Sequence, residues 1–248
     1  MYQFFIEQEN ITEDGIWITD SKEVNHIKNV LRMKQGEKVT LCCQQNGREY
    51  VCAIAEFSPG GVRMVIEDIS GETRELPVDI TLFQCLPKGD KMELIIQKAV
   101  ELGASAIIPV ASGRSVVKLD EKKAAKKVQR WQEIAKSAAK QAKRTKIPEV
   151  GSVRPFAQAV EDAAKMDMLL LPYEDAKGMA HSREVMAQVA EKKTLGIIIG
   201  PEGGFQEKEV ALAVEHGAHA ITLGRRILRT ETAGMAVLSV LMFLLEEE

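Results

Sequence analysis

The sequence predicts an α/β protein in which a parallel sheet is preceded by a small β-barrel domain. Two observations support this prediction. Residues 1–72 contain short runs of alternating apolar and polar residues, separated by turn signals such as Gln45-Asn46-Gly47, which is typical of a small barrel. From Leu76 onward, continuous apolar segments alternate with helical segments, which is typical of a parallel sheet covered on both faces. We therefore expect two domains, over residues 1–72 and 73–248, joined by the polar stretch 70–75.

The elements of each domain follow from hydrophobic periodicity and turn signals. In the first domain, a helix over residues 23–31 precedes strands at 39–43, 50–55 and 62–66. In the second domain, strands are expected at 78–86, 106–110, 168–173, 195–200 and 220–223. Helices are expected at 90–102, 121–144, 155–165, 182–192, 207–216 and 232–245. Ligands of such sheets bind beyond the carboxyl ends of the strands, so the residues that follow each strand are the first candidates for a site.

Composition narrows the class of protein. The chain has 248 residues and a net charge of -3, and 45% of its residues are hydrophobic. Its four cysteines form no CxxC pair, and His216 and His219 have no third ligand nearby, so we expect no metal. The apolar run 235–245 is too short to span a bilayer, and residues 1–5 do not resemble a signal peptide. These features predict a cytoplasmic protein that does not bind a membrane.

Positive charge is concentrated in one segment. Residues 122–146 hold ten Lys or Arg residues, and only Glu133 opposes them. A local basic stripe on an otherwise acidic chain indicates a polyanion partner at one place. A solvated helix face would give the same pattern, so the stripe alone does not decide between the two.

The first glycine-rich turn follows the strand that ends at Ile199. It reads Gly200-Pro201-Glu202-Gly203-Gly204-Phe205. Glycines let a ligand approach the backbone closely, and the proline stiffens the turn. The loop lacks the Lys-Ser/Thr of a phosphate loop and does not fit GxGxxG, so a phosphate is a poor match. Taken alone, a tight turn without any ligand fits equally well.

The second turn makes a pocket more plausible. The strand 220–223 ends at Gly224, and residues 225–232 lead into the last helix, which Thr230 or Thr232 is expected to cap. Apolar side chains in this loop suit a flat aromatic group. Two such loops at one sheet edge form a pocket whose neutral donors fit S-adenosylmethionine. The expected cofactor-binding residues are Ile199, Gly200, Pro201, Glu202, Gly203, Gly204, Leu223, Gly224, Ile227, Leu228 and Thr232.

At these two loops the chain resembles the RsmE family of 16S ribosomal RNA uridine methyltransferases, which belong to the SPOUT class of α/β-knot enzymes. The GPEGGF and LGxRILRxETA runs carry the resemblance, and residues 26–32, 86–93, 97–103 and 114–118 extend it over nearly the whole chain. The resemblance implies a PUA-like first domain and a C-terminal trefoil knot around S-adenosylmethionine. It also implies a homodimer that methylates N3 of one uridine of 16S RNA within the small ribosomal subunit.

Residue roles follow from that resemblance. Glu231 is the candidate base for the N3 proton, and Arg229 is the candidate to orient the uracil or stabilise its negative charge. A first-turn acid beside the helix dipole and a surface ion pair are the structural alternatives for these two residues. Departures from the family's usual pattern at Gln3, Asn25 and residues 140–144 put individual RNA contacts in question. The expected RNA-binding residues are His26, Lys28, Arg32, Lys88, Arg114, Arg130, Lys140, Lys143 and Arg144.

Three other functions remain open at this point. A related SPOUT enzyme would methylate a ribose 2′-hydroxyl, and a ribosome-assembly factor with the same fold would bind RNA without a cofactor. A nucleotide-dependent enzyme would use the glycine loop for phosphate, against which the missing Lys-Ser/Thr argues.

Overall fold

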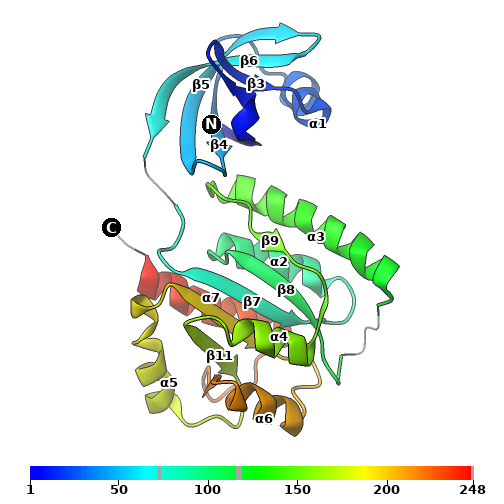
Figure 1. Cartoon of the computed structure of the whole chain (residues 1–248), viewed down its shortest axis with the longest axis vertical. Helices are drawn as coiled ribbons and strands as arrows, with labels where there is room; N and C mark the ends of the chain where they lie inside the picture. The colour runs from blue at the N-terminus through cyan, green and yellow to red at the C-terminus, as the bar shows by residue number, and fades with distance from the viewer. Residues whose placement is uncertain (72–73, 116–118, 247–248) are drawn as a thin grey trace. The chain divides into compact units, whose positions relative to one another are not determined.

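The computed structural model describes residues 1–71, 74–115 and 119–246, which form two compact units. Figure 1 shows the elements of both units. The first unit comprises Met1–Glu75 and Ala139–Ile147, and the second comprises Leu76–Ala138 and Pro148–Glu248. The boundary expected between residues 72 and 73 lies outside the described residues. The segment 139–147 belongs to the first unit although it is far from it in the sequence.

The first unit is built on a six-stranded mixed sheet in the order β1-β4-β5-β6-β3-β2. Its strands are β1 (Tyr2–Ile6), β2 (Ile11–Thr12), β3 (Gly15–Ile18), β4 (Lys38–Cys43), β5 (Arg48–Ser58) and β6 (Gly61–Ser70). β1 pairs with β4 in parallel, and the other pairs are antiparallel. The strands β4, β5 and β6 confirm the predicted ones. β1 to β3 were missed, and in β1 the buried Gln3 breaks the alternation that marks a half-buried strand.

A helical segment lies beside this sheet, but it is not one regular helix. Asp20 caps α1 (Ser21–Asn25) by accepting a hydrogen bond from Lys22 N at 2.9 Å. A π-helix, η2 (His26–Val30), follows directly and packs Ile27 into the core. Arg32 comes after it with a positive φ of 53°. The predicted helix 23–31 is therefore split between two helix types, and π-helical turns are frequent at functional sites.

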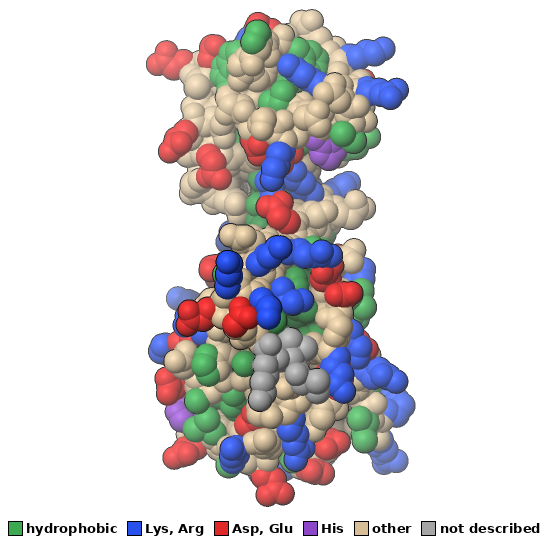
Figure 2. All heavy atoms as spheres, turned by 90° about the vertical axis from the view of Figure 1, so that its right-hand side faces the viewer, with side chains coloured by type: hydrophobic (Ala, Val, Ile, Leu, Met, Phe, Trp, Pro, Cys, Tyr) green, Lys and Arg blue, Asp and Glu red, His purple; other side chains and the backbone are tan. Residues whose placement is uncertain are grey.

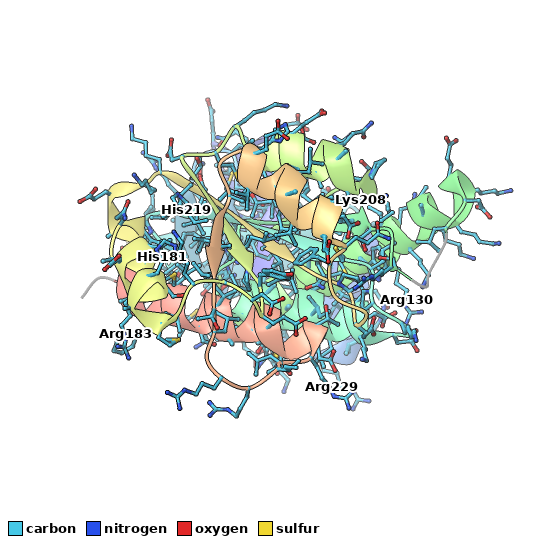
Figure 3. All side chains as sticks on the ribbon, turned by 90° about the horizontal axis from the view of Figure 1, so that it is seen from below. Arg130, His181, Arg183, Lys208, His219 and Arg229 are labelled. Atoms are coloured by element: carbon cyan, nitrogen blue, oxygen red, sulfur yellow. The ribbon has the colours of Figure 1, made fainter. Side chains whose placement is uncertain are left out.

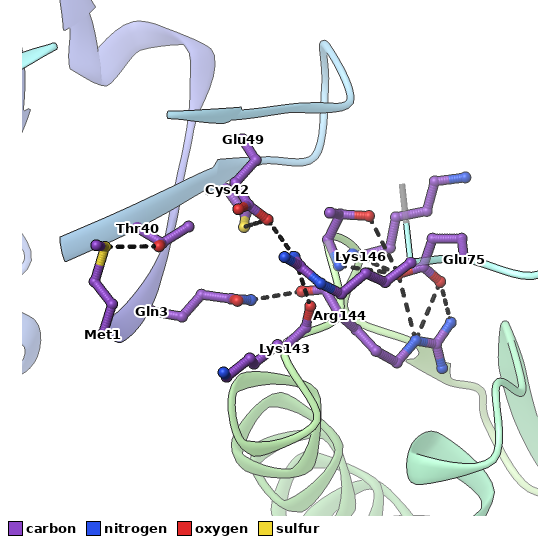
Figure 4. Close-up of polar contacts among 11 residues, drawn as sticks. Met1, Gln3, Thr40, Cys42, Glu49, Glu75, Lys143, Arg144 and Lys146 are labelled. Carbon is purple, nitrogen blue, oxygen red and sulfur yellow. Dashed lines mark hydrogen bonds and ion pairs between the residues drawn. The ribbon is translucent and has the colours of Figure 1, made fainter. Parts of the chain in front are cut away.

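The returning segment is fixed to the first unit by buried charge (Figure 4). Arg144 is 4% exposed, and its guanidinium forms an ion pair with Glu75. Glu75 Oε1 also accepts hydrogen bonds from the backbone N–H groups of Thr145 (3.0 Å) and Lys146 (3.1 Å). Gln3 Nε2 donates to the Arg144 carbonyl at 2.5 Å. Arg144 therefore holds this segment in place, and its buried, paired charge does not support the RNA contact expected of it.

The described residues at the end of the predicted joining stretch 70–75 make side-chain contacts within the first unit. Arg74 forms an ion pair with Glu49 at 2.6 Å and donates to the Lys143 carbonyl at 3.4 Å. Glu75 is the acceptor at the centre of the Arg144 cluster. The described residues at the carboxyl end of this stretch are thus part of the folded unit.

The second unit is an entirely parallel sheet in the order β10-β8-β7-β12-β11-β13, with β9 paired to β8. The five predicted strands are confirmed, whereas the two-residue strands β9 and β10 are too short for a periodic signal. The bounds are β7 (Asp79–Cys85), β8 (Ala106–Ala111), β9 (Glu149–Val150), β10 (Arg154–Pro155), β11 (Met168–Pro172), β12 (Thr194–Ile199) and β13 (His219–Ile221).

The helices of this unit lie close to their predicted positions, with three differences. The predicted helix 182–192 divides into α5 and a short 3₁₀ helix, α3 ends at Gln141, and α7 begins two residues early. Lys143 follows α3 with a positive φ of 57°, the left-handed conformation that ends many helices. The bounds are α2 (Lys91–Glu101), α3 (Glu121–Gln141), α4 (Phe156–Ala163), α5 (Met179–Met186), η3 (Val189–Glu191), α6 (Glu207–Glu215) and α7 (Thr230–Leu245).

Alternation along β7 shows which helices cover which face of the sheet. Phe83 and Cys85 belong to the core cluster that α4 and α6 complete. Leu82 and Gln84 point the other way, toward α7, where Gln84 contacts Thr230. α7 packs in turn on α2. Both faces of the sheet are therefore covered, as the apolar strands predicted, and one buried glutamine faces the start of the last helix.

Candidate functional site

The glycine loop is a compact turn at the carboxyl end of β12. Pro201 and Phe205 are buried, and the Phe205 ring meets Phe156 of α4 edge-on, with ring centroids 5.9 Å apart. A Cβ atom at Gly200 would lie 3.1 Å from the Phe205 ring, and Gly204 has a φ of +68°. Glycine at these two positions is therefore required by the shape of the loop.

Gly203 differs from its two neighbours. Its φ is not positive, and a Cβ atom there would lie 3.5 Å from Arg114 Cβ, an ordinary contact. The Gly203 carbonyl accepts a hydrogen bond from Arg114 Nη1 at 3.0 Å. The contacts around position 203 do not require a glycine, and its exposed backbone is open to close approach by a ligand.

The loop is also anchored at its far end. Gln206 and Glu209 form a capping box at the start of α6, with Gln206 N donating to Glu209 Oε2 at 2.8 Å. Glu209 Oε1 accepts a second hydrogen bond, from Gly113 N at 2.8 Å. The segment after β8 is thereby fastened to the glycine loop, which makes the loop a preformed wall.

The two glycine-rich loops meet at Thr230, the first residue of α7. Its hydroxyl donates to the Gly200 carbonyl at 2.6 Å and accepts from Gln84 Nε2 at 2.8 Å. β13 lies two strands from β12, so the loop after β13 must cross the end of β11 to reach this point. Residues 200–205 and 223–232 are thus at the same sheet edge, as predicted.

The expected helix cap is wrong. Arg229 is the N-cap residue of α7 and makes no capping hydrogen bond with its side chain. Thr230 lies inside the helix and directs its hydroxyl at Gly200 and Gln84, and Thr232 is exposed. The threonine at the helix start therefore joins two segments of the site. This contact could have been expected from the sequence, because Gln84 lies in an otherwise apolar strand and a buried amide there needs a polar partner.

The middle of the second loop is open to solvent. Gly224 has a φ of +122°, and Leu223 and Leu228 are half-buried. Ile227 is 84% exposed, so it lines no slot in this structure, in contrast to its expected role. Arg229 is also exposed and projects from the start of α7 (Figure 3). This loop, unlike the glycine loop, presents exposed apolar and cationic side chains that a ligand could cover.

A charged cluster connects the two loops to α2. Lys91 Nζ lies 3.2 Å from Glu202 Oε1 and 3.3 Å from Glu231 Oε2. Glu202 Oε1 also accepts a hydrogen bond from Lys88 N at 3.0 Å. Burial raises the pKa of Glu202, but the Lys88 N–H and the Lys91 ammonium outweigh it and hold that pKa below its ordinary value. The hydrogen bond to Glu202 raises the pKa of Lys91, so both groups stay charged at neutral pH.

Two buried acceptors at this place have no hydrogen-bond partner. In the part of the chain that the structure describes, they are Gln84 Oε1 and Glu231 Oε2, the second with only the ion-pair contact to Lys91. Buried polar atoms are nearly always hydrogen-bonded in native proteins. Two such atoms at one sheet edge leave acceptors available to a ligand.

Two hollows lie next to segments that contact the glycine loop or the helix after it. One, of about 260 Å³, includes Pro87 and Gly89, next to the Lys88 amide that binds Glu202. The other, of about 420 Å³, includes Gly113, which binds Glu209. Both are lined by Leu86 and Leu119. Among the described residues, neither lining includes a residue of the glycine loop or of the second loop, where Ile227 faces solvent.

The candidate RNA-binding residues fall into two groups. Lys88 and Arg114 are exposed beside the glycine loop, and Arg32 and Lys143 are exposed in the first unit. Lys and Arg side chains gather over α3 in the view of Figure 2, and Arg130 on this helix is exposed although it pairs with Glu93. These exposed side chains can bind a phosphate, because any ion pair that they make at the surface is weak.

The second group is engaged inside the first unit. Lys140 Nζ lies 2.5 Å from Glu23 and above the Phe4 ring. His26 meets Phe4 edge-on, and Lys28 Nζ donates to the Ser58 carbonyl at 3.1 Å. These contacts give Lys140 a structural role comparable to that of Arg144.

The described residues contain no cluster of three or more His, Cys, Asp or Glu side chains that could hold a metal ion. All four cysteines are buried and free of disulfides, and burial raises the pKa of the Cys85 thiol to about 12. Among the helices that the structure describes, none has the length and apolarity to cross a membrane.

Comparison with known proteins agrees with this fold. The family model for an RNA methyltransferase domain matches residues 74–242, and that for an RNA methyltransferase PUA domain matches residues 18–67. Ribosomal RNA small subunit methyltransferase E of Bacillus subtilis is 40% identical, with 98% of this chain and 96% of the relative covered. The protein of the same name from Synechocystis sp. is 30% identical, with 99% and 78% covered.

A solved structure extends the comparison to the whole fold. Ribosomal RNA small subunit methyltransferase E from Neisseria gonorrhoeae, bound to S-adenosyl methionine, is 32% identical and superposes with a TM-score of 0.82. The alignment covers 98% of both chains. The parallel-sheet unit and the PUA-like unit thus define an RNA methyltransferase. More narrowly, the chain belongs to the ribosomal RNA small subunit methyltransferase E family, which confirms the predicted fold class and the resemblance that the two loops carried.

Proposed function

We propose that this protein transfers a methyl group from S-adenosylmethionine to N3 of a uridine of 16S RNA within the small ribosomal subunit. The convergence of the two loops at Thr230 carries the proposal, since Thr230 ties the glycine loop to the start of α7. Gly203, which the fold does not require, and the two unpartnered acceptors add support. The relatives' names and the S-adenosyl methionine of the Neisseria structure support the coarser part of the proposal, methyl transfer from this cofactor to small-subunit ribosomal RNA.

The residues of this edge fit the cofactor chemically. An adenosyl sulfonium needs neutral backbone donors and apolar contacts rather than a phosphate grip, and the glycine loop presents backbone with no lysine in it. When bound, the cofactor would supply a methyl group on a sulfur that is a good leaving group. Ile199 and the glycine loop would form one wall, and Leu223, Gly224, Ile227, Leu228 and Thr232 would form the other.

The chemical step needs a proton acceptor and a stabiliser of charge. As the N3 electron pair forms a bond to the methyl carbon, the C–S pair remains on sulfur and the N3 proton passes to Glu231. The Glu231 side chain is 17% exposed, and its Oε2 has no hydrogen-bond partner among the described residues. Arg229, which lies two residues before Glu231, would donate a hydrogen bond to a uracil carbonyl and offset the negative charge that develops there.

RNA affinity would come from the exposed basic residues and from the half-buried His26 and Lys28, whose contacts inside the first unit are with an aromatic ring and a carbonyl rather than with a carboxylate. His26, Lys28 and Arg32 would contact RNA from the first unit together with Lys143, while Lys88, Arg114 and Arg130 would act from the second. Phosphate contacts of this kind make binding salt-dependent without specifying the sequence. The low aromatic content of 5% leaves few stacking platforms.

The homodimer is also part of the proposal. Phe243 is 82% exposed on α7, and Val240, Leu244 and, on the adjoining α2, Leu94 are also exposed. Large exposed apolar groups on neighbouring helices are typical of an interface. A second copy would cover them, and the cytoplasm, where ribosomal subunits are assembled, would be the place of action. The C-terminal trefoil knot stays a prediction from the resemblance.

Labelled methyl transfer tests the function. The protein is incubated with tritiated S-adenosylmethionine and 30S subunits from cells lacking the enzyme, and the product is digested to nucleosides. The proposal expects 3-methyluridine from 16S RNA. A 2′-O-methylated nucleoside would reveal the ribose-directed alternative, and RNA binding without transfer would reveal an assembly factor. Either of those results rejects the proposal.

A further inference from the structure

Lys91, the first residue of α2, places its ammonium between two carboxylates from different segments. One is Glu202 in the glycine loop, and the other is Glu231 in the first turn of α7, at 3.2 and 3.3 Å from Nζ. The Lys91 side chain is 32% exposed. The transfer step described above gives this lysine no role, although it contacts the proposed base directly.

The contacts of Lys91 join α2, the glycine loop and the start of α7, and strand pairing in the sheet does not fix the positions of these three segments. The glycine loop and the second loop both leave the regular strands, so their relative position depends on side-chain contacts. The Thr230 hydroxyl is one such contact and fixes the backbone at Gly200. Lys91 is another, and it reaches the Glu231 carboxylate itself.

A second lysine on α2 shows what an ordinary surface pair looks like. Lys98 pairs with Glu101 one turn away at 2.7 Å, and both side chains are about one-third exposed. A pair of this kind within one helix contributes little and holds nothing else in place. Lys91 differs because Glu231 is more buried and its Oε2 has no hydrogen-bond partner in the described part of the chain.

Removing the ammonium would change the electrostatics of both carboxylates. Glu202 would keep the Lys88 amide, whereas Glu231 would lose its nearest cation and face a like charge. Two like charges that share a site repel each other, so the Glu231 carboxylate would move away from its place beside the glycine loop. A displaced Glu231 cannot accept the N3 proton.

We propose that Lys91 is a positioning residue for methyl transfer. It ties the Glu231 carboxylate to the glycine loop, so that this base faces the acceptor nitrogen. Lys91 itself gives up no proton, because the proton of N3 goes to Glu231 and the ammonium stays charged throughout. This role rests on the proposed function, since it assigns Lys91 to the same site and the same step.

The test compares Lys91→Met and Lys91→Arg with Lys98→Met as the matched control. For each we measure kcat and KM for 30S subunits, the Kd for S-adenosylmethionine by calorimetry, and Tm. If Lys91 aligns the base Glu231, Lys91→Met lowers kcat about tenfold or more and changes KM for RNA only a little. Lys91→Arg keeps the charge and restores most of kcat, and Lys98→Met behaves as wild type.

A double variant separates positioning from an independent role. If Lys91 acts through Glu231, adding Lys91→Met to the Glu231→Gln variant lowers kcat only a little further. An equal loss in both backgrounds overturns the proposal, as does a rise in KM or in the cofactor Kd with kcat unchanged. If the wild-type protein transfers no methyl group, the proposed function fails by itself. In that case the unfolding free energies of wild type, Lys91→Met, Glu231→Gln and the double variant give the coupling energy between Lys91 and Glu231. A coupling energy of zero overturns the positioning claim.

Discussion

The molecule contains two clusters of charge that look alike in the sequence and differ in the structure. In the first unit, the Arg144 guanidinium and the Glu75 carboxylate are buried together, and Glu75 is further saturated by backbone N–H groups. In the second unit, Lys91 faces Glu202 and Glu231, and Glu231 Oε2 lacks a hydrogen bond. The first cluster is closed, and the second remains open toward two loops.

The difference teaches how to separate structural from functional charge. A buried ion pair whose hydrogen bonds are all made has nothing to offer a ligand, and removing one partner harms the fold. A cluster with unmade hydrogen bonds beside exposed loops costs stability in the free protein and is retained where a ligand completes it. The following variants are ordered from the largest expected effect to the smallest.

Gly203→Val is expected to have the largest effect on the open site. The fold tolerates a Cβ atom at this position, but a branched side chain would occupy the space through which a ligand reaches the backbone. We expect cofactor binding to disappear in calorimetry while the circular dichroism spectrum is retained. Gly178→Val, at a glycine with no neighbour within 4 Å, is the control and should bind normally. Unchanged affinity in Gly203→Val would remove the loop from the cofactor site.

Glu75→Gln tests the closed cluster. It leaves the buried Arg144 charge without its counter-ion, which should cost about 3 kcal/mol of unfolding free energy. Glu67→Gln, at the exposed pair with Lys38, should cost less than about 0.5 kcal/mol. Cofactor binding by the second unit should persist in both variants. A stability loss of the same size at both positions would contradict the distinction between the clusters.

The same residue predicts a pH dependence. Burial raises the pKa of Glu75, but the Arg144 guanidinium and the backbone N–H groups outweigh it and hold that pKa below its ordinary value. Because the folded-state pKa is lower than the unfolded one, the pair stabilises the protein above the ordinary carboxyl pKa. That contribution is lost as the pH falls through the folded-state pKa. Wild type and Glu75→Gln should therefore converge in stability in acid denaturation experiments.

Thr230→Val should have a moderate effect. The substitution keeps the shape of the side chain and removes both the donor to Gly200 and the acceptor for Gln84. Leaving these buried groups unpaired should cost about 1–3 kcal/mol and lower Tm. Thr232→Val, at an exposed position of the same helix, should leave Tm within about a degree or two. Equal Tm values would show that Thr230 does not tie the loops together.

Ile227→Ala should have the smallest effect. At 84% exposure this side chain adds little to the stability of the free protein, so Tm should not change. If the loop closes on the cofactor, partial burial of the isoleucine contributes about 1 kcal/mol, or about fivefold in Kd. Val214→Ala, at an exposed residue of α6, is the control. Equal cofactor affinity in the two variants would exclude Ile227 from the pocket.

The sequence predicted the second unit better than the first for a physical reason. Strands such as β12 are buried on both faces, so they appear as unbroken apolar runs bounded by turns. β1 mixes the buried Gln3 with apolar residues, because Gln3 binds a carbonyl from a segment more than a hundred residues away. Periodicity carries no information about a partner at that distance, so β1 was missed.

The two loops of the site were predictable from the sequence, whereas its charged contacts were not. Glycines and apolar residues marked the two loops, because backbone shape and close approach require those residue types at fixed spacing. Charge partners were not predictable, because a lysine that binds phosphate and one that binds a glutamate have the same letter. Lys140 and Arg144 were assigned to RNA and bind Glu23 and Glu75, whereas Lys91 at the site was overlooked.

One comparison tests the account most directly: methyl transfer and stability measured side by side for Glu231→Gln. If the open cluster is the site of proton removal, transfer to 30S subunits should fall by about a hundredfold or more, while the unfolding free energy is unchanged or higher. Cofactor affinity should also hold. Full transfer activity in this variant, or a loss of stability as large as that of Glu75→Gln, would contradict the claim that the open cluster serves catalysis and the closed one serves the fold.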